Sequence, residues 1–226
     1  MKKKYSLVFI FFLVAHLFIL NGQTMYNRHF QAKFNFGIKA GVNVASQYSP
    51  GSNGVFEVKS ILGFTGGGYF NYFFHRVLAF QTEISVSMKG SHWKELNYAQ
   101  DEKKDILTYI DIPLLIRYQP LGYLNVHAGP QVSYLPRAMQ YDYKTRLKSA
   151  VEDYYKSFDF SLVLGVEANL PKNIDLTVRY IRGLSSAYAP GGYYFKSYNN
   201  YIQFTAGYRF EKRRQLQSKT KTRVRR

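Results

Sequence analysis

The sequence predicts an all-β fold: an eight-stranded antiparallel up-and-down transmembrane β-barrel. Three features of the 226-residue chain predict it. Apolar and polar residues alternate in eight segments, the connections between the segments are alternately short and long, and the two faces of the segments differ in polarity as membrane strands require.

The N-terminus predicts a signal peptide over residues 1–22. Lys2, Lys3 and Lys4 precede the apolar run YSLVFIFFLVAHLFIL, and a charged segment followed by a hydrophobic core is typical of an export signal. A cut after Gly22 would follow a small residue. The alternative is an uncleaved anchor, but about 16 apolar residues are few for a hydrocarbon core of about 30 Å. Residues 23–33 are expected to form an N-terminal leader.

Residues 34–210 contain the segments that predict strands. In each segment apolar and polar residues alternate over about 10 to 14 residues between turn-forming residues, and such a length crosses a bilayer when the strand is tilted. The predicted strands cover residues 34–46, 61–73, 77–89, 105–119, 123–135, 157–170, 173–185 and 199–210.

The connections between these segments alternate in length. The short ones are FFHR around His75, QPLG around Pro120, and PK at residues 171–172. The long ones cover residues 47–60, 90–104, 136–156 and 186–198. A barrel with short periplasmic turns and long extracellular loops follows, with both termini on the periplasmic side.

The polarity of the two faces separates a membrane barrel from a soluble one. In segment 77–89, one face consists of Leu78, Phe80, Thr82, Ile84, Val86 and Met88, and the other of Ala79, Gln81, Glu83, Ser85, Ser87 and Lys89. A soluble calyx needs apolar residues inside and polar residues outside. Here one face of each segment is apolar and the other carries charge, which favours an apolar face toward lipid and a polar face toward the lumen. The barrel must also close, because an open strand edge in lipid leaves unpaired backbone groups.

The lumen of so small a barrel is expected to be filled by side chains. The alternation predicts an inward, structural charge network of Lys39, Glu83, Asp111, Arg117, Glu167, Asp175, Arg179 and Arg209. Those expected near mid-height are Lys39, Glu83, Asp111 and Arg179, and the other four are expected toward the periplasmic rim. Each level then has two cations and two acids. Buried charges are costly unless they are paired. A proton or ion pathway through the same residues is the functional alternative.

The composition excludes several kinds of site. The chain has no cysteine, so disulfides and thiolate chemistry are absent. The histidines show no spacing typical of metal ligands, and no catalytic residue, metal or cofactor is predicted. His92, Asp101 and Asp105 in the second long loop are the one arrangement that would suit a loop-based enzyme; a solvated polar loop is the simpler interpretation.

Two further segments are unusual in composition. Residues 211–226 carry eight Lys/Arg against one acid and predict a disordered, basic periplasmic tail. The last long loop contains an aromatic group: Tyr188, Tyr193, Tyr194, Phe195, Tyr198 and Tyr201. We interpret it as an interfacial girdle, with a binding surface as the alternative.

Six motifs resemble one known family. They are FGIKAGVNVA at 36–45, YIDIPLLIRY at 109–118, VHAGPQVSYL at 126–135, LVLGVEANL at 162–170, LTVRYIRGL at 176–184 and FTAGYRF at 204–210. Over residues 34–210 the chain resembles the PorT family of Bacteroidota outer-membrane β-barrels. The resemblance implies an eight-stranded-type barrel domain and, through the founding member, an association with type IX protein secretion. One departure is the basic tail that follows Phe210, where such barrels commonly end.

Together these features predict a non-enzymatic outer-membrane protein. Its expected role is structural or in assembly, as an accessory of type IX secretion, and its expected partners are outer-membrane lipid and other outer-membrane or secretion-system proteins. Nucleic acid is not an expected partner of an exported chain. A narrow pore or solute-binding barrel is the alternative, and a loop-based outer-membrane enzyme is the second alternative.

Overall fold

The computed structural model describes residues 33–50, 56–95, 102–189 and 196–210. The predicted signal peptide, most of the leader and the basic tail therefore lie outside the described residues. Within them the strands and 3-10 helices are β1 (Lys33–Tyr48), β2 (Phe56–Phe73), β3 (Leu78–Glu95), β4 (Glu102–Leu121), β5 (Leu124–Asp142), β6 (Lys148–Ala150), η2 (Glu152–Tyr154), β7 (Phe158–Asn169), η3 (Pro171–Asn173), β8 (Ile174–Gly183) and β9 (Tyr198–Arg209).

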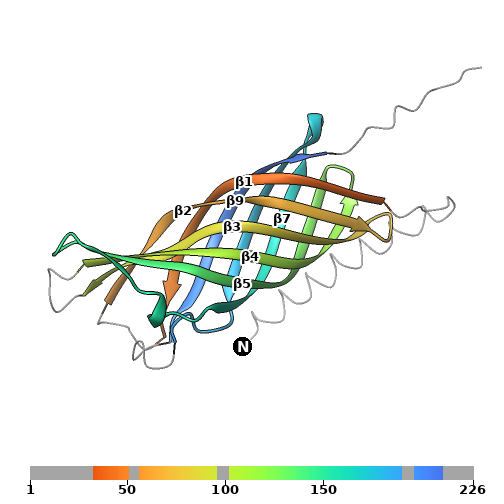
Figure 1. Ribbon diagram of the computed structural model, residues 1–226. Coiled ribbons are helices and arrows are strands. Elements are labelled where there is room, and N and C mark those ends of the chain that lie inside the picture. The colour runs from red at the N-terminus through yellow and green to blue at the C-terminus, as the bar shows by residue number, and fades with distance from the viewer. Residues whose placement is uncertain (1–32, 51–55, 96–101, 190–195, 211–226) are drawn as a thin grey trace, which may run out of the picture.

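Eight of these strands form a closed antiparallel barrel (Figure 1). Neighbours in the chain pair with one another, β5 pairs with β7, and β1 pairs with β9 from Gly37 opposite Arg209 to Tyr48 opposite Tyr198. The remaining strand, β6, pairs with the end of β5 alone. The predicted fold class is confirmed, and closure leaves no sheet edge that would face lipid.

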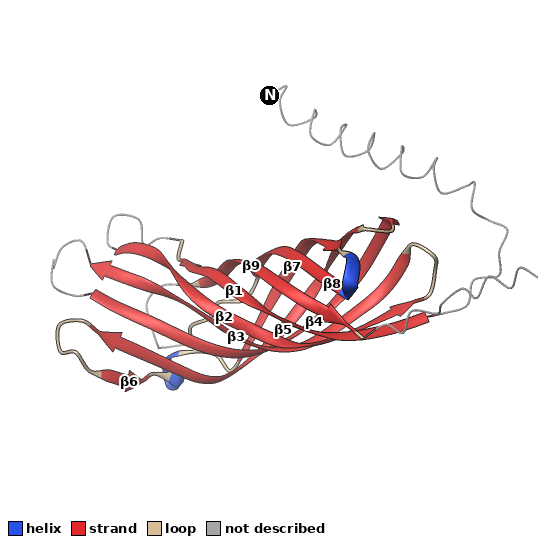
Figure 2. Ribbon diagram, turned by 90° about the horizontal axis from the view of Figure 1, so that it is seen from above, coloured by secondary structure: helices blue, strands red, loops and turns tan. Residues whose placement is uncertain are grey.

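The barrel has two different ends. The short connections after β2, β4 and β7 lie at the end where β1 begins and β9 ends; we call this the short-turn end. The opposite, long-loop end carries β6, which forms a hairpin with the end of β5, and the short helix η2 that follows it (Figure 2). Among the described residues, none of the helical segments has the length and apolar character needed to cross a bilayer.

The strands β2 to β5 are longer than predicted at the long-loop end. β2 begins at Phe56 instead of residue 61, β3 ends at Glu95 instead of 89, β4 begins at Glu102, and β5 ends at Asp142. Backbone pairing continues there, for example from Lys94 to Glu102. Outside the bilayer neither face of a strand has to be apolar, so the alternation that marked the strands ends before the strands do.

The outward face of the wall is apolar. Phe64 and Ile84 are each 65 % exposed, and Leu164 is 55 % exposed. Inward neighbours such as Ser87 and Asn71 are fully buried. Side chains one residue apart on a strand point to opposite faces, so this burial pattern places lipid outside and polar groups inside.

Candidate functional site

The interior of the barrel holds the predicted charged side chains. Every second residue of each wall strand points inward, so charges far apart in the sequence meet along the axis. The described residues form three groups of ion pairs there, at the centre, toward the long-loop end and toward the short-turn end. All of these pairs except one, that of Arg209 with Asp175, have side chains no more than 5 % exposed.

The central group, which we call the central triad, consists of Lys39, Glu83 and Arg179. Arg179 donates two hydrogen bonds to the Glu83 carboxylate, from Nη1 to Oε2 over 2.8 Å and from Nη2 to Oε1 over 2.6 Å. Lys39 Nζ also contacts Glu83 Oε1. Arg179 Nε donates to His127 Nε2 over 2.8 Å. One carboxylate thus stabilises two buried cations, because both of its oxygens accept hydrogen bonds from them.

The second group lies toward the long-loop end. Lys89 Nζ is 2.8 Å from Asp111 Oδ1 and donates to Ser133 Oγ over 3.3 Å. The same ammonium lies 4.5 Å from the ring centroid of Tyr109 and 4.8 Å from that of Tyr201. A cation between two aromatic faces gains electrostatic attraction that adds to its ion pair.

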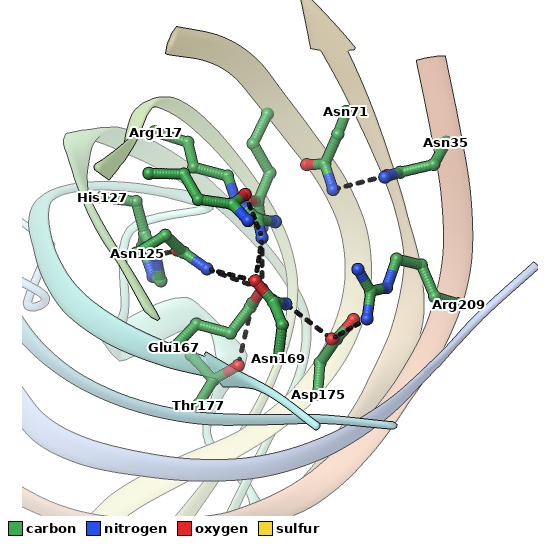
Figure 3. A network of polar contacts seen from close by, with 12 residues as sticks. Asn35, Asn71, Arg117, Asn125, His127, Glu167, Asn169, Asp175, Thr177 and Arg209 are labelled. Carbon is green, nitrogen blue, oxygen red and sulfur yellow. Dashed lines mark hydrogen bonds and ion pairs between the residues drawn. The ribbon is translucent and has the colours of Figure 1, made fainter. Parts of the chain in front are cut away.

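The third group lies toward the short-turn end (Figure 3). Arg117 Nη2 contacts Glu167 Oε1 over 3.0 Å, and Asn169 accepts a hydrogen bond from the same guanidinium over 3.0 Å. Asn169 in turn donates to Asp175 over 2.7 Å, and Asp175 pairs with Arg209 over 2.9 Å. The amide of Asn169 therefore links the two ion pairs into one network.

Two sets of these contacts bridge the lumen between opposite walls. β3 and β8 lie opposite each other in the ring, as do β4 and β9, with three wall strands between them on either side. Glu83 and Arg179 join the first pair of strands, and Tyr109 and Asn199 join the second over 3.3 Å. Side chains that meet across the full diameter occupy the axis of the barrel at both heights.

The structure brings the eight predicted charges inside but changes their grouping. The central triad has two cations and one acid, and Asp111 pairs with Lys89, outside the predicted set. The predicted balance of two against two is therefore wrong at mid-height. Toward the short-turn end the predicted set does contain two cations and two acids, paired as Arg117 with Glu167 and Arg209 with Asp175. Buried Asp105 and Asp159 were also missed. Lys89, Asp105 and Asp159 lie an even number of residues from inward residues of the same strands, so the alternation also points them inward. They were left out because they lie at or near the ends of the predicted strands.

Apolar residues also face inward, beside the polar and charged residues that the alternation predicted there. One buried cluster inside the barrel consists of Ala45, Ile61, Leu115, Val163, Ile181 and Tyr201. Tyr201 thus points into the lumen and is not part of an interfacial girdle. Tyr188 is buried in a second apolar cluster and is not part of a girdle either, whereas Tyr198 is partly exposed. Tyr193, Tyr194 and Phe195 lie outside the described residues.

A second apolar cluster closes the long-loop end, and we call it the loop cap. It consists of Leu107, Tyr109, Leu135, Ala138, Val151, Tyr155, Ala187 and Tyr188. Val151 and Tyr155 come from the connection between β5 and β7, and they pack on Ala187 and Tyr188 of the last long loop. Lys156 N donates to Ala187 O over 2.8 Å, so the two loops are joined through the backbone over the mouth of the barrel.

Tyr155 also fixes the loop cap to the wall, because its hydroxyl donates to Asp105 Oδ2 over 2.8 Å. We expect Tyr155→Phe to destabilise the cap by about 1 kcal/mol, the usual net value of one hydrogen bond. Hydrogen exchange of residues 148–157 should become faster while that of the wall strands stays unchanged. Tyr143→Phe, at a hydroxyl-bearing ring that is 44 % exposed, is the control; equal effects of the two changes would contradict the assignment.

The arrangement proposed for a loop-based enzyme does not form. Asp105 pairs with Ser91 across β3 and β4 and points inward, whereas His92 pairs with Lys104 and lies on the outward face. Asp101 lies outside the described residues. No group of three or more metal-ligating side chains occurs in the described part of the chain.

The match to a protein-family model decides the family. Residues 21–189 match the model described as outer membrane protein beta-barrel domain. The chain belongs to this family. Membership and the closed barrel with its apolar exterior place the protein in the outer membrane, embedded in lipid.

Solved structures of outer-membrane barrels are similar to this member of the family in fold. Neisserial surface protein A is 14 % identical, with a TM-score of 0.49, over 79 % of this chain and 99 % of its own. The attachment invasion locus protein Ail of Yersinia pestis is 13 % identical, with a TM-score of 0.47 and the same coverage. OprG of Pseudomonas aeruginosa is 15 % identical, with a TM-score of 0.36, over 79 % and 96 %. No curated protein sequence matches the chain.

Proposed function

We propose that the protein is a non-enzymatic structural or assembly component of the outer membrane whose lumen is closed to solutes. The contact that carries this proposal is the bridge between Glu83 and Arg179, which spans opposite walls of the barrel at its centre. The loop cap lies over the long-loop end as a second layer. A pore needs a continuous water column, and paired side chains on the axis leave little space for one. Partners are then bound outside the barrel.

Conductance in planar bilayers tests the closed lumen. We expect the reconstituted protein to be electrically silent, because the charges that would attract ions are paired with one another across the axis. A variant with Glu83→Ala and Arg179→Ala removes the bridge, and any current it carries shows that the protein was inserted. Steady single-channel steps from the unmodified protein would support the narrow pore instead.

The proposal includes export and a defined orientation. Residues 1–22 act as a cleaved signal peptide and residues 23–33 as a leader, and both chain termini of the barrel domain lie on the periplasmic side. The supporting observation is that Lys33 of β1 and Arg209 of β9 lie at the short-turn end. The chain has no cysteine, so single cysteines can report the topology. A membrane-impermeant maleimide should label Arg146→Cys in intact cells and should not label Lys172→Cys; the reverse pattern would overturn the orientation.

The finer role that we propose is that of a PorT-family protein of Bacteroidota, accessory to type IX protein secretion. The support is the resemblance of YIDIPLLIRY and the other five motifs, and the basic tail at 211–226 offers a periplasmic contact for an acidic partner. Deletion of the gene should abolish secretion of other proteins. Co-purification of the intact complex with and without residues 211–226 then identifies the partner; secretion that continues unchanged would remove this role and leave the barrel's structural role intact.

A further inference from the structure

Among the described residues, cations on the outward face of the wall strands are confined to the long-loop end. Lys104 of β4, Arg137 of β5 and Lys148 of β6 lie on this face, beyond the aromatic contact between Tyr134 and Phe158, whose ring centroids are 5.4 Å apart. At the short-turn end the corresponding outward positions are aromatic or aliphatic, and their exposed members include Phe34, Phe36, Phe70, Tyr72, Leu121, Ile174, Tyr208 and Phe210.

The strand register places the three cations around one small surface. Lys104 lies opposite Tyr141, and Tyr141 lies opposite Lys148, so the two lysines flank β5 about 10 Å apart at the usual strand spacing. Arg137 lies opposite Thr108, which is four residues from Lys104 and therefore about 13 Å away along β4. We call the surface between Lys104, Arg137 and Lys148 the cationic triangle.

These three cations have no acidic partner among the described residues, in contrast to the cations of the lumen. In the described part of the chain, each lumen cation contacts a carboxylate. On the outward face Lys94 pairs with Glu102 over 3.2 Å. Lys104, Arg137 and Lys148 take part in none of the ion pairs among the described residues, although Glu102 precedes Lys104 by only two positions. Their charge is available to an external anion.

The middle of the cationic triangle is apolar. Ile106 and Met139 face each other across β4 and β5, and Met139 lies opposite Ala150 of β6. Ile106 and Met139 are partly exposed. A soluble polyanion would leave these residues uncovered. An amphiphile would satisfy both features at once, because its acyl chains continue down the apolar wall while its headgroup meets the cations.

We propose that the cationic triangle binds the phosphate groups of a phosphorylated glycolipid in the leaflet that surrounds the long-loop end. Ammonium and guanidinium groups at the edge of a hydrocarbon layer attract anionic headgroups, and Arg137 can hold a phosphate through two parallel hydrogen bonds. The barrel is thereby fixed at a defined depth, with lipid ordered beside β4, β5 and β6. This inference depends on the proposed function in one respect, the orientation that decides which leaflet surrounds the long-loop end. It does not require secretion or a closed lumen.

Native mass spectrometry of the detergent-solubilised full chain tests this. The probe is a glucosamine-based glycolipid that carries two phosphates, and the comparison lipid has the same acyl chains without phosphate. We expect the unmodified protein to retain the first lipid and not the second. Because one such cation contributes roughly fivefold in affinity, the variant Lys104→Gln, Arg137→Gln, Lys148→Gln should bind at least about tenfold more weakly.

A matched variant removes the same charge elsewhere: Arg76→Gln and Lys172→Gln in short turns, and Lys196→Gln in the last long loop. It should lose less than about threefold. The exchange Lys104→Arg, Arg137→Lys, Lys148→Arg should keep most of the binding, which shows that a loss in the glutamine variant does not come from misfolding. Equal losses in the two glutamine variants, or equal retention of the phosphate-free lipid, would overturn the proposal. Neither outcome depends on secretion, conductance or labelling in cells.

Discussion

Replacement of Glu83 by glutamine should lower the free energy of unfolding by about 3–5 kcal/mol, the usual cost of removing one partner from a buried ion pair. Glu83 is 3 % exposed and holds both Lys39 and Arg179. The neutral amide leaves two cations in the lumen without a counter-charge, and its NH2 group points a donor at other donors. The shape of the side chain is unchanged, so the effect is electrostatic.

Urea titration of the barrel folded in lipid vesicles measures this change, and the shift of the folded band on unheated gels gives an independent reading. Glu57→Gln is the matched control, since its contact with Lys59 is 3.5 Å long and both side chains are about half exposed; we expect less than about 0.5 kcal/mol. Adding Arg179→Met to Glu83→Gln should restore part of the loss. A destabilisation below about 1 kcal/mol for Glu83→Gln alone would show that water, and not Glu83, stabilises the two cations.

The fold was predictable because successive side chains of a wall strand face lipid and lumen in turn, which gives the sequence a two-residue period. Lipid favours apolar residues at the outward positions of a spanning strand, as at Ile84 and Phe204, and a filled lumen admits the polar residues between them. The same rule says nothing beyond the bilayer. The long-loop ends of β2 to β5, and β6 as a whole, are held by backbone pairing that leaves no side-chain pattern, and for this reason they were missed.

The sequence predicts which charged residues face the lumen but not which of them form ion pairs with one another. Strand parity places Glu83 and Arg179 in the lumen, and it places Lys89 on the same polar face as Glu83. Which charges meet depends on the stagger of strands around the ring, and the sequence gives no direct signal of that stagger. Thus the bridge from β3 to β8 and the pair of Lys89 with Asp111 emerge only from the closed structure. The loop cap joins two loops that are far apart in sequence, so no local pattern could reveal it.

Closure of the ring leads to the second large effect, at Gly41 in the pairing of β1 with β9. A Cβ atom on Gly41 would lie 1.9 Å from the carbonyl oxygen of Phe204 and 2.7 Å from Thr205 Cα, which are backbone atoms that cannot turn aside. Gly41→Ala must therefore push β9 away from β1. We expect a loss of about 3 kcal/mol, the upper end for overpacking, because backbone groups along the widened pairing have no water in lipid to replace their partners.

The matched control for Gly41→Ala is Gly66→Ala on β2. A Cβ atom there would meet nothing nearer than Lys39 O at 3.7 Å, so the same substitution adds the same methyl group to a neighbouring strand without a clash. Folding into vesicles, followed by the gel shift and by urea titration, should be impaired by the first change and nearly unaffected by the second. If both variants fold alike, β1 and β9 can separate at no cost, and closure of the ring does not contribute the stability assigned to it here.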